Sequence, residues 1–246
     1  MIASLDELSR QVHQAIGGEK ELSGRITRVR EILAELAVDM TWLYRFVEEK
    51  LLSPDFLDQQ INTIWPNEIR LYQSPEREFS VLAYVWEPKT RDVVHDHGAW
   101  GVISPVNQPL GERKYRRLDD GRHEDTAELE EASFQVMAPG ETTFVGALDE
   151  GIHRMENDSA SHVLSVSVYG HSLGRGYVRF FDPETLRVWR AYRVRTNKPV
   201  LVLRALATRP DSRGESLLSR LQDRDLPEAI KEEGRRVLRA WHSVET

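Results

Sequence analysis

The spacing of apolar residues changes twice along the chain, and each change predicts a different kind of structure. Up to about residue 64 apolar positions recur at helical spacing. One such helix face carries Ile26, Val29, Ile32, Leu33 and Leu36. From about residue 68 the period becomes two, as in strands, and after about residue 198 it is helical again. The pattern therefore predicts helices, then a strand-rich segment, then helices.

The ends of two helices carry local signals. Ser4 with Glu7 matches a capping box, and Gly17-Gly18 supplies a stop. Near the other end of the chain, Asp225 and Glu228 flank a second helix start that has a proline in its first turn. These signals predict a helix beginning near residue 5 and another near residue 228.

The middle segment predicts many short strands. Between residues 79 and 86 both alternating sets are largely apolar, which is typical of a strand covered on two sides. Turn signals then recur at short intervals, with strand-like stretches between them at 111–118, 133–137, 163–169, 177–181 and 186–194. This spacing favours a sandwich or a barrel. We expect three parts: helices over 1–67, the strand-rich domain over 68–197, and a helical extension over 198–246.

Composition narrows the classes of function. The chain has 246 residues, of which 40% are hydrophobic and 30% charged, as in an ordinary globular protein. The formal net charge of −7 argues against broad binding of nucleic acid. No apolar run approaches a membrane span, and the first residues do not resemble a signal peptide, so we expect a cytoplasmic protein. The absence of cysteine excludes disulfides, thiolate-ligated metal and a cysteine nucleophile.

Histidines are the strongest candidates for chemistry. Of the eight, His95 and His97 stand two apart at the end of a predicted strand. Period-two geometry sends both imidazoles to one face, where they can reach a single metal ion. The pair alone is weak, because two surface histidines in a turn would look the same. A third histidine, His153, lies in Gly-Ile-His-Arg-Met-Glu-Asn after a Pro-Gly turn and a strand-like stretch.

Together the His-x-His pair and the distant Gly-x-His-x-x-x-Asn resemble the two metal motifs of the cupin superfamily. The resemblance implies a double-stranded β-helix barrel that is mainly β, with N-terminal helices and a C-terminal helical extension. It also implies His95, His97 and His153 as metal ligands. The usual cupin carboxylate is missing after His97, where the chain reads Gly-Ala-Trp-Gly-Val-Ile. The next glutamate, Glu112, stands far along the following strand.

A three-histidine set resembles the thiol dioxygenases, the cysteine dioxygenase family, and in particular its bacterial 3-mercaptopropionate dioxygenase-like members. The stretches that carry this resemblance are 79–101, 151–154 and 165–170, and it covers roughly residues 68–190. It implies one Fe(II), a small thiol substrate bound through sulfur, and oxidation by O2 to a sulfinate. Three neutral imidazoles leave the ion its double charge, which favours thiolate binding.

The resemblance to the thiol dioxygenases is less complete at the other active-site residues. The family's tyrosine falls on Tyr169. Its Ser-His-Tyr relay falls on Ser165, Ser167 and Tyr169, so that a serine replaces the relay histidine. The Cys–Tyr crosslink of mammalian-type members cannot form in a chain without cysteine.

A carboxylate on the substrate would need a cationic anchor, best an arginine. Arg70 and Arg179 are the two main candidates, each about one residue from a family position, and Arg175 is a third. For any single arginine, a surface ion pair is the more frequent explanation.

Three interpretations remain open. The favoured one is a thiol dioxygenase whose partners are a small carboxylate-bearing thiol and O2, acting as a monomer or homodimer without nucleic acid or membrane. The second is another metal-dependent cupin enzyme acting on a non-thiol substrate. The third is a non-catalytic cupin that binds a ligand or acts as a sensor, with the C-terminal helices as its output or dimer surface.

Overall fold

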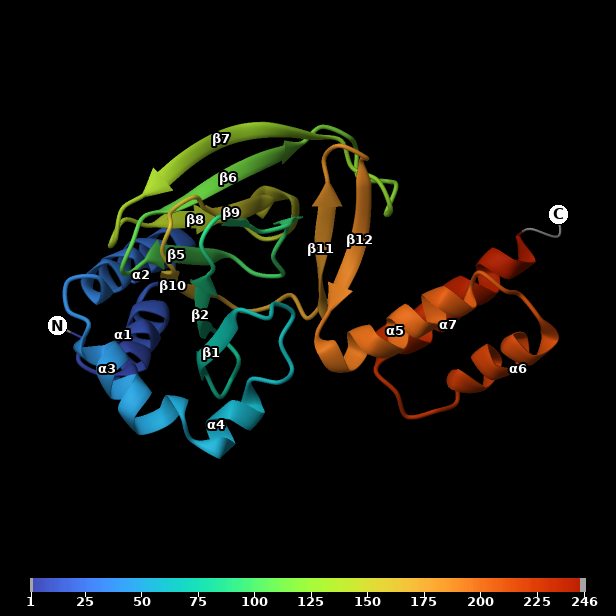
Figure 1. Ribbon diagram of the computed structural model, residues 1–246, viewed down its shortest axis with the longest axis horizontal. Helices are drawn as coiled ribbons and strands as arrows, with labels where there is room; N and C mark the ends of the chain where they lie inside the picture. The colour runs from blue at the N-terminus through green and yellow to red at the C-terminus, as the bar shows by residue number, and fades with distance from the viewer. Residues whose placement is uncertain (1, 244–246) are drawn as a thin grey trace. The chain divides into compact units, whose positions relative to one another are not determined.

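The computed structural model describes residues 2–243, and its first part is helical (Figure 1). The helices are α1 (Leu5–Gly18), α2 (Leu22–Leu36), α3 (Thr41–Phe46), a π-helical turn (Val47–Leu51) and α4 (Pro54–Gln59). The hydroxyl of Ser4 accepts a hydrogen bond from the backbone N–H of Glu7 at 3.2 Å, and α1 ends at Gly18. Both predicted signals of this helix are therefore confirmed.

The strands form two antiparallel sheets. The first has the order β1-β2-β10-β5-β8. Its strands are β1 (Glu68–Gln73), β2 (Ser80–Trp86), β10 (Val163–Tyr169), β5 (Gly101–Pro105) and β8 (Thr143–Val145). The second has the order β12-β11-β4-β9-β6-β7, with β3 paired to β9. Its strands are β12 (Arg187–Tyr192), β11 (Tyr177–Asp182), β4 (Val94–His95), β9 (His153–Asn157), β6 (Leu110–Arg117), β7 (Leu129–Met137) and β3 (Thr90–Arg91).

Strand β10 shows how the first sheet divides its two faces. Val166 and Val168 belong to the core that the sheet shares with α1 and α2, which lie against it in Figure 1. The residues between them alternate to the opposite face, because successive side chains of a strand point to opposite sides. This opposite face carries Ser165, Ser167 and Tyr169, and it lines a pocket. The helices thus cover one face and leave the other for the site.

The second sheet brings the two histidine motifs together. Strands β4 and β9 are paired with His95 directly opposite His153, although the two residues are far apart in the sequence. Asn157, the last residue of the second motif, donates from its amide to the backbone oxygens of Trp86 and Glu87 at 3.1 and 3.0 Å. This contact ties the end of β9 to the end of β2. The two sheets therefore meet around the predicted site, and the predicted fold class is confirmed.

The remaining helices form a unit of their own. The chain divides into two compact units, Met1–Arg190 and Ala191–Thr246, and α5 (Val194–Leu206), α6 (Ser212–Leu221) and α7 (Glu228–His242) belong to the second. The indole N–H of Trp241 donates to the backbone oxygen of Ala207 at 2.8 Å. The buried apolar side chains of these helices are Val200, Leu203, Leu218, Ile230, Val237 and Trp241. Among the described residues, no helix is both long enough and apolar enough to cross a membrane.

Candidate metal centre

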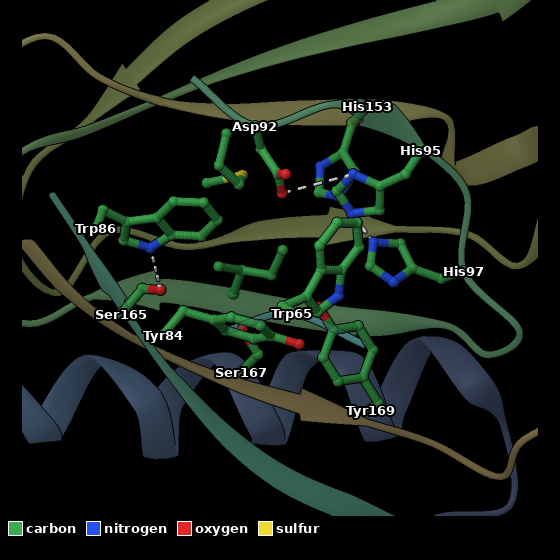
Figure 2. A pocket seen from close by; sticks show the side chains of 12 residues that line it. Trp65, Tyr84, Trp86, Asp92, His95, His97, His153, Ser165, Ser167 and Tyr169 are labelled. Carbon is green, nitrogen blue, oxygen red and sulfur yellow. Dashed lines mark hydrogen bonds and ion pairs between the residues drawn. The ribbon is translucent and has the colours of Figure 1, made fainter. Parts of the chain in front are cut away.

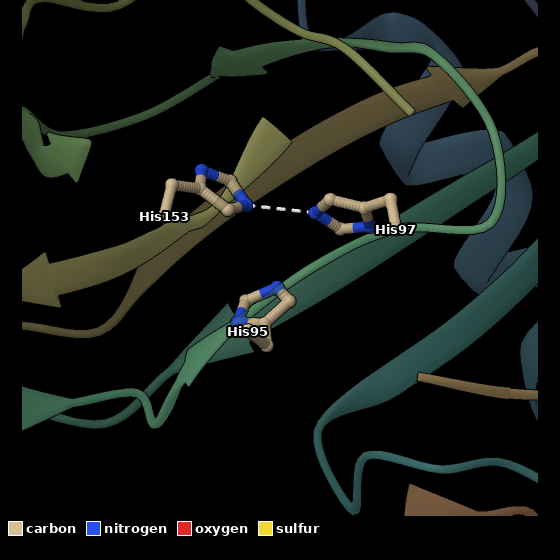
Figure 3. Close-up of side chains that lie close together, drawn as sticks. All are labelled: His95, His97 and His153. Carbon is tan, nitrogen blue, oxygen red and sulfur yellow. Dashed lines mark hydrogen bonds between the residues drawn. The ribbon is translucent and has the colours of Figure 1, made fainter. Parts of the chain in front are cut away.

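Three imidazoles converge from two neighbouring segments of the second sheet (Figure 3). His95 ends β4, His97 follows it two residues later, and His153 opens β9 beside them. One nitrogen from each ring lies within 4.8 Å of the others, and all three residues are buried. The Nε2 atoms of His97 and His153 are 2.7 Å apart.

The outer nitrogens of two rings are already engaged. Nδ1 of His95 lies 2.8 Å from the backbone oxygen of Val93, and Nδ1 of His153 lies 2.8 Å from a carboxylate oxygen of Glu112. Both partners are acceptors, so each Nδ1 must carry the proton. Each Nε2 then presents a lone pair toward the other rings, which is what a metal ion requires.

Burial also keeps the rings of His95 and His97 neutral. It lowers the pKa of His95 to about 3, and the neighbouring His153 acts in the same direction. Burial likewise holds the pKa of His97 well below its ordinary value, with His95 and His153 adding to the effect. Neutral imidazoles with converging lone pairs fit a divalent cation, which requires deprotonated ligands. The set of three histidines could therefore hold a metal ion.

A buried carboxylate stands behind the third ligand. Glu112 is 1% exposed and accepts hydrogen bonds from the hydroxyl of Thr143 at 2.6 Å and the amide of Gln135 at 2.8 Å. Burial raises the pKa of Glu112, but the hydrogen bond from His153 and the ammonium of Lys114 outweigh it and hold the pKa below its ordinary value. The group is therefore ionised at neutral pH.

The three histidines line a small pocket between the two sheets (Figure 2). Its free volume of about 10 Å³ has room for roughly one water molecule. The other lining residues are Trp65, Tyr84, Trp86, Asp92, Ile103, Met155, Ser165, Ser167 and Tyr169. This lining is aromatic and hydroxyl-rich, and it contains no lysine or arginine among the residues described.

The predicted hydroxyl residues all reach this pocket. Ser165 accepts a hydrogen bond from the indole N–H of Trp86 at 2.9 Å. The hydroxyl oxygen of Ser167 is buried and makes no hydrogen bond within the described part of the chain. Burial raises the pKa of Tyr169, although the nearby hydroxyls of Ser167 and Tyr84 oppose the rise. Tyr169 is thus a neutral phenol at physiological pH, and its catalytic role stays a prediction.

A glycine of the first motif makes room for that tyrosine. A Cβ atom at Gly101 would lie 2.6 Å from a ring carbon of Tyr169, which is closer than any such contact in proteins. The Tyr169 ring lies 5.0 Å from the ring of His97, measured between centroids. Gly101 therefore lets the phenol pack beside a metal ligand.

Two further residues border the ligand His95. The indole ring of Trp65, from the loop before β1, lies 4.7 Å from the imidazole and 4.8 Å from the ring of Phe180, between centroids. A carboxylate oxygen of Asp92 lies 3.7 Å from Nδ1 of His95. Burial raises the pKa of Asp92 to about 6.

The candidate anchors occupy different surroundings. Arg179 donates from Nε to Asp96 at 2.7 Å and from Nη2 to Asp149 at 2.5 Å. Arg175 also binds the fully buried Asp96, with two hydrogen bonds of 2.9 and 2.6 Å. Both guanidinium groups are thus held by carboxylates, and neither residue lines the pocket.

Arg70 also lies outside the lining residues, but it shares their face of the sheet. It is paired with Leu82 of β2, which is in turn paired with Ser167 of β10. Directly opposed residues of antiparallel strands point to the same side. The side chain of Arg70 therefore projects from the pocket face, in one cross-strand row with Ser167. That either arginine anchors a substrate stays a prediction.

Several residues of the site were not found from the sequence. Trp65 gives no signal because it lies in a loop that the strand pattern does not reach. Asp92 and Trp86 stand near the motifs, but only the paired strands show that they face the ligands. Glu112 appeared in the sequence as a carboxylate too distant to be a ligand, and its contact with His153 depends on the pairing of β6 with β9.

Comparison with known proteins gives the following similarities. No family model matches the chain. Among solved structures, a Cupin_2 domain of an XRE family transcriptional regulator from Enterobacter cloacae is 13% identical, covers 42% of this chain and 94% of its own, and has a TM-score of 0.30. An oxalate oxidase is 17% identical, with coverages of 50% and 63% and a TM-score of 0.33. DMSP lyase DddQ from Ruegeria pomeroyi is 12% identical, with coverages of 56% and 59% and a TM-score of 0.34.

These structures are cupin-domain proteins and enzymes, but TM-scores of this size carry no argument about function. The description of the site therefore depends on its own geometry. Two antiparallel sheets, with helices on one outer face, enclose three buried imidazoles that could hold a metal ion.

Proposed function

We propose that the protein is an Fe(II)-dependent thiol dioxygenase that oxidises a small thiol to its sulfinate. The observation that carries the proposal is the ligand set: three buried imidazoles converge, and no carboxylate of the described residues joins them. The nearby carboxylates of Glu112 and Asp92 approach only the outer Nδ1 nitrogens of His153 and His95. The ion would keep its full double charge, which favours an anionic sulfur ligand.

The proposed reaction is R–SH + O2 → R–SO2⁻ + H⁺. Both oxygen atoms of O2 end on sulfur, which loses four electrons to them, and the thiol proton is released. Iron held by the three histidines would supply a common binding point for thiolate and O2, as open-sided iron sites do. The pocket is small, with a free volume of about 10 Å³, so it would limit the access of bulk water to this point.

The chain's own residues would orient the substrate. Tyr169 and Tyr84 are buried phenols whose pKa values are raised by burial, so both keep a hydrogen to donate. Ser167 offers a buried hydroxyl without a partner, and such a group gains a hydrogen bond when a polar ligand enters. We assign Tyr169 and Ser167 to the substrate or to bound oxygen, and Ser165, which accepts a hydrogen bond from Trp86, to the support of the pocket wall.

We further propose that the thiol carries a carboxylate and that Arg70 receives it. Thiol sulfur alone fixes one point of a substrate, and a second point is needed to orient it. Arg70 projects from the pocket face in the row of Ser167, whereas Arg179 is already bound by two carboxylates. These placements favour Arg70 of the two candidates.

A metal-dependent reaction on a non-thiol substrate is the second candidate. It is favoured by Ser167, which stands where the thiol dioxygenases have a relay histidine, and by a lining without a cation. A different small ligand could use the same three-histidine site.

Oxygen uptake on a panel of thiols tests the proposal. The protein is loaded anaerobically with Fe(II) and mixed with cysteine, 3-mercaptopropionate, cysteamine or mercaptosuccinate. We expect uptake of O2 with at least one carboxylate-bearing thiol and one sulfinate formed for each O2 consumed. Iron-loaded protein that forms no sulfinate from any of these thiols would favour the second candidate.

A further inference from the structure

Glu112 is a buried carboxylate whose neighbours come from several strands. Its residue lies on β6, while the imidazole of His153 comes from β9, the hydroxyl of Thr143 from β8 and the amide of Gln135 from β7. Nδ1 of His153 faces one carboxylate oxygen, and the other two groups face the second oxygen. The ammonium of Lys114 is 3.6 Å from that second oxygen.

A second buried carboxylate nearby shows what an ordinary structural ion pair looks like in this sheet. Glu156, on β9, is 2% exposed and accepts hydrogen bonds from Nε of Arg113 at 2.9 Å and Nε of Arg154 at 2.6 Å. Its partners are arginines with exposed surface, and no histidine contacts it in the described chain. In Glu112, by contrast, one carboxylate oxygen is hydrogen-bonded to the imidazole of His153, a candidate metal ligand.

That contact decides which nitrogen of His153 is free. A carboxylate can only accept, so the hydrogen bond requires the proton on Nδ1 and leaves the lone pair on Nε2. Nε2 is the atom that lies 2.7 Å from Nε2 of His97. Thr143 and Gln135 restrain the carboxylate, and the carboxylate in turn restrains the plane of the imidazole.

We propose that Glu112 is a positioning residue of the metal centre, which holds His153 in the tautomer and orientation that bind the ion. Its negative charge lies one imidazole away from the cation and would stabilise the bound ion. Carboxylates in this position raise metal affinity by about 10–100-fold. The inference rests on the proposed metal centre and is independent of whether the substrate is a thiol.

The test is the affinity of metal-free protein for Co(II), followed by its visible absorption spectrum and by competition with a chelator. Glu112→Gln keeps the size and one acceptor but removes the charge, and Glu156→Gln is the matched control. We expect Glu112→Gln to weaken Co(II) binding about 10–100-fold and to alter the Co(II) spectrum. Glu156→Gln should change the affinity by less than about twofold and leave the spectrum unchanged, because its carboxylate touches no ligand.

Thermal unfolding of the metal-free variants separates positioning from loss of structure. If Glu112→Gln does not fold, Thr143→Val replaces it, since this variant removes one restraint on the carboxylate and should weaken Co(II) binding several-fold. Folded Glu112→Gln with wild-type affinity, or equal losses in both glutamate variants, would overturn the proposal.

The outcomes also separate this inference from the proposed function. Normal Co(II) binding by the wild-type chain without sulfinate formation would contradict thiol oxidation alone. A wild-type chain that binds no divalent metal would overturn the role of Glu112 together with the metal centre.

Discussion

A phenol beside a metal site can orient a ligand by donating a hydrogen bond only while it stays protonated, and Tyr169 meets this condition. Burial raises its pKa, and its ring packs against the ring of His97. Replacement by phenylalanine keeps the ring and removes the hydroxyl. We therefore expect Tyr169→Phe to keep its metal and to lose about 10–100-fold in turnover, the range of a group that contributes about 1.5–3 kcal/mol.

Metal analysis and steady-state oxygen uptake on the same samples check this prediction. Tyr115→Phe, a half-buried tyrosine outside the pocket, serves as the control and should leave both values unchanged. Wild-type turnover in Tyr169→Phe would show that the hydroxyl of Tyr169 does not contribute to catalysis.

The charge of the substrate is tested at Arg70. A charge-assisted hydrogen bond is worth about 1.5–3 kcal/mol, so Arg70→Gln should raise KM for 3-mercaptopropionate by one to two orders of magnitude. Cysteamine has no carboxylate, and its KM should not change in this variant. If Arg179→Gln raises KM and Arg70→Gln does not, Arg179 is the anchor. Equal efficiency of wild-type protein on both thiols would rule out either arginine.

Site residues could be identified from the sequence where a local motif sets their geometry. They could not be identified where the pairing of distant strands brings them to the site. The spacing of His95 and His97 already requires a common face. The third candidate ligand, His153, was identified from its Gly-x-His-x-x-x-Asn motif, and the structure places it opposite His95. Glu112 became meaningful only through the pairing of β6 with β9, which the sequence does not encode locally.

At the level of elements, β6 and β9 are held together by charge as well as by backbone hydrogen bonds. Burial pushes the pKa of Glu156 upward, but hydrogen bonds from Arg113 and Arg154 outweigh it and hold the pKa below its ordinary value of 4.5. A carboxyl with a lowered pKa in the folded state stabilises the protein above its unfolded pKa. This stability is lost as the pH falls through the folded value.

Glu156→Gln should therefore lower the free energy of unfolding by about 1.5–3 kcal/mol at pH 7. The difference should be smaller at pH 3, which lies below the ordinary pKa of 4.5, because part of the linked stability is then already lost. Urea unfolding at the two pH values measures this difference. A loss that is the same at both would show that the side chain acts by packing and not by charge.

The sequence predicted the bounds of a strand well where its residues are apolar on both faces or alternate between apolar and polar. It predicted the bounds of charged strands and short helices less well. Strand β10 has the bounds predicted from its pattern, 163–169. Strand β7 begins at Leu129, before the predicted residue 133, because its acidic residues pair with arginines of β6 across the strands. Helix α6 begins at Ser212, where the side chain of Asp211 caps it through the N–H of Gly214 at 2.6 Å.

At the scale of the whole chain, the order of helices, strands and helices follows the apolar periodicity. The predicted border of the C-terminal helices at residue 198 differs from the observed division after Arg190. Strand β12 ends at Tyr192 and α5 begins at Val194, with Pro199 inside that helix. Pro199 is the sixth residue of this helix, past the first turn, and it has no N–H to donate to the preceding turn. The periodicity alone does not show this.

The metal content of the protein tests the central claim most directly. Purified chain loaded anaerobically with Fe(II), then freed of excess metal, is analysed for iron per chain in the wild type and in His95→Ala, His97→Ala and His153→Ala. Because the three nitrogens form one site, we predict about one iron per wild-type chain and loss of most of it in each variant. His171→Ala, an exposed histidine outside the pocket, should keep full iron content. Full iron content in folded His153→Ala protein would contradict the account.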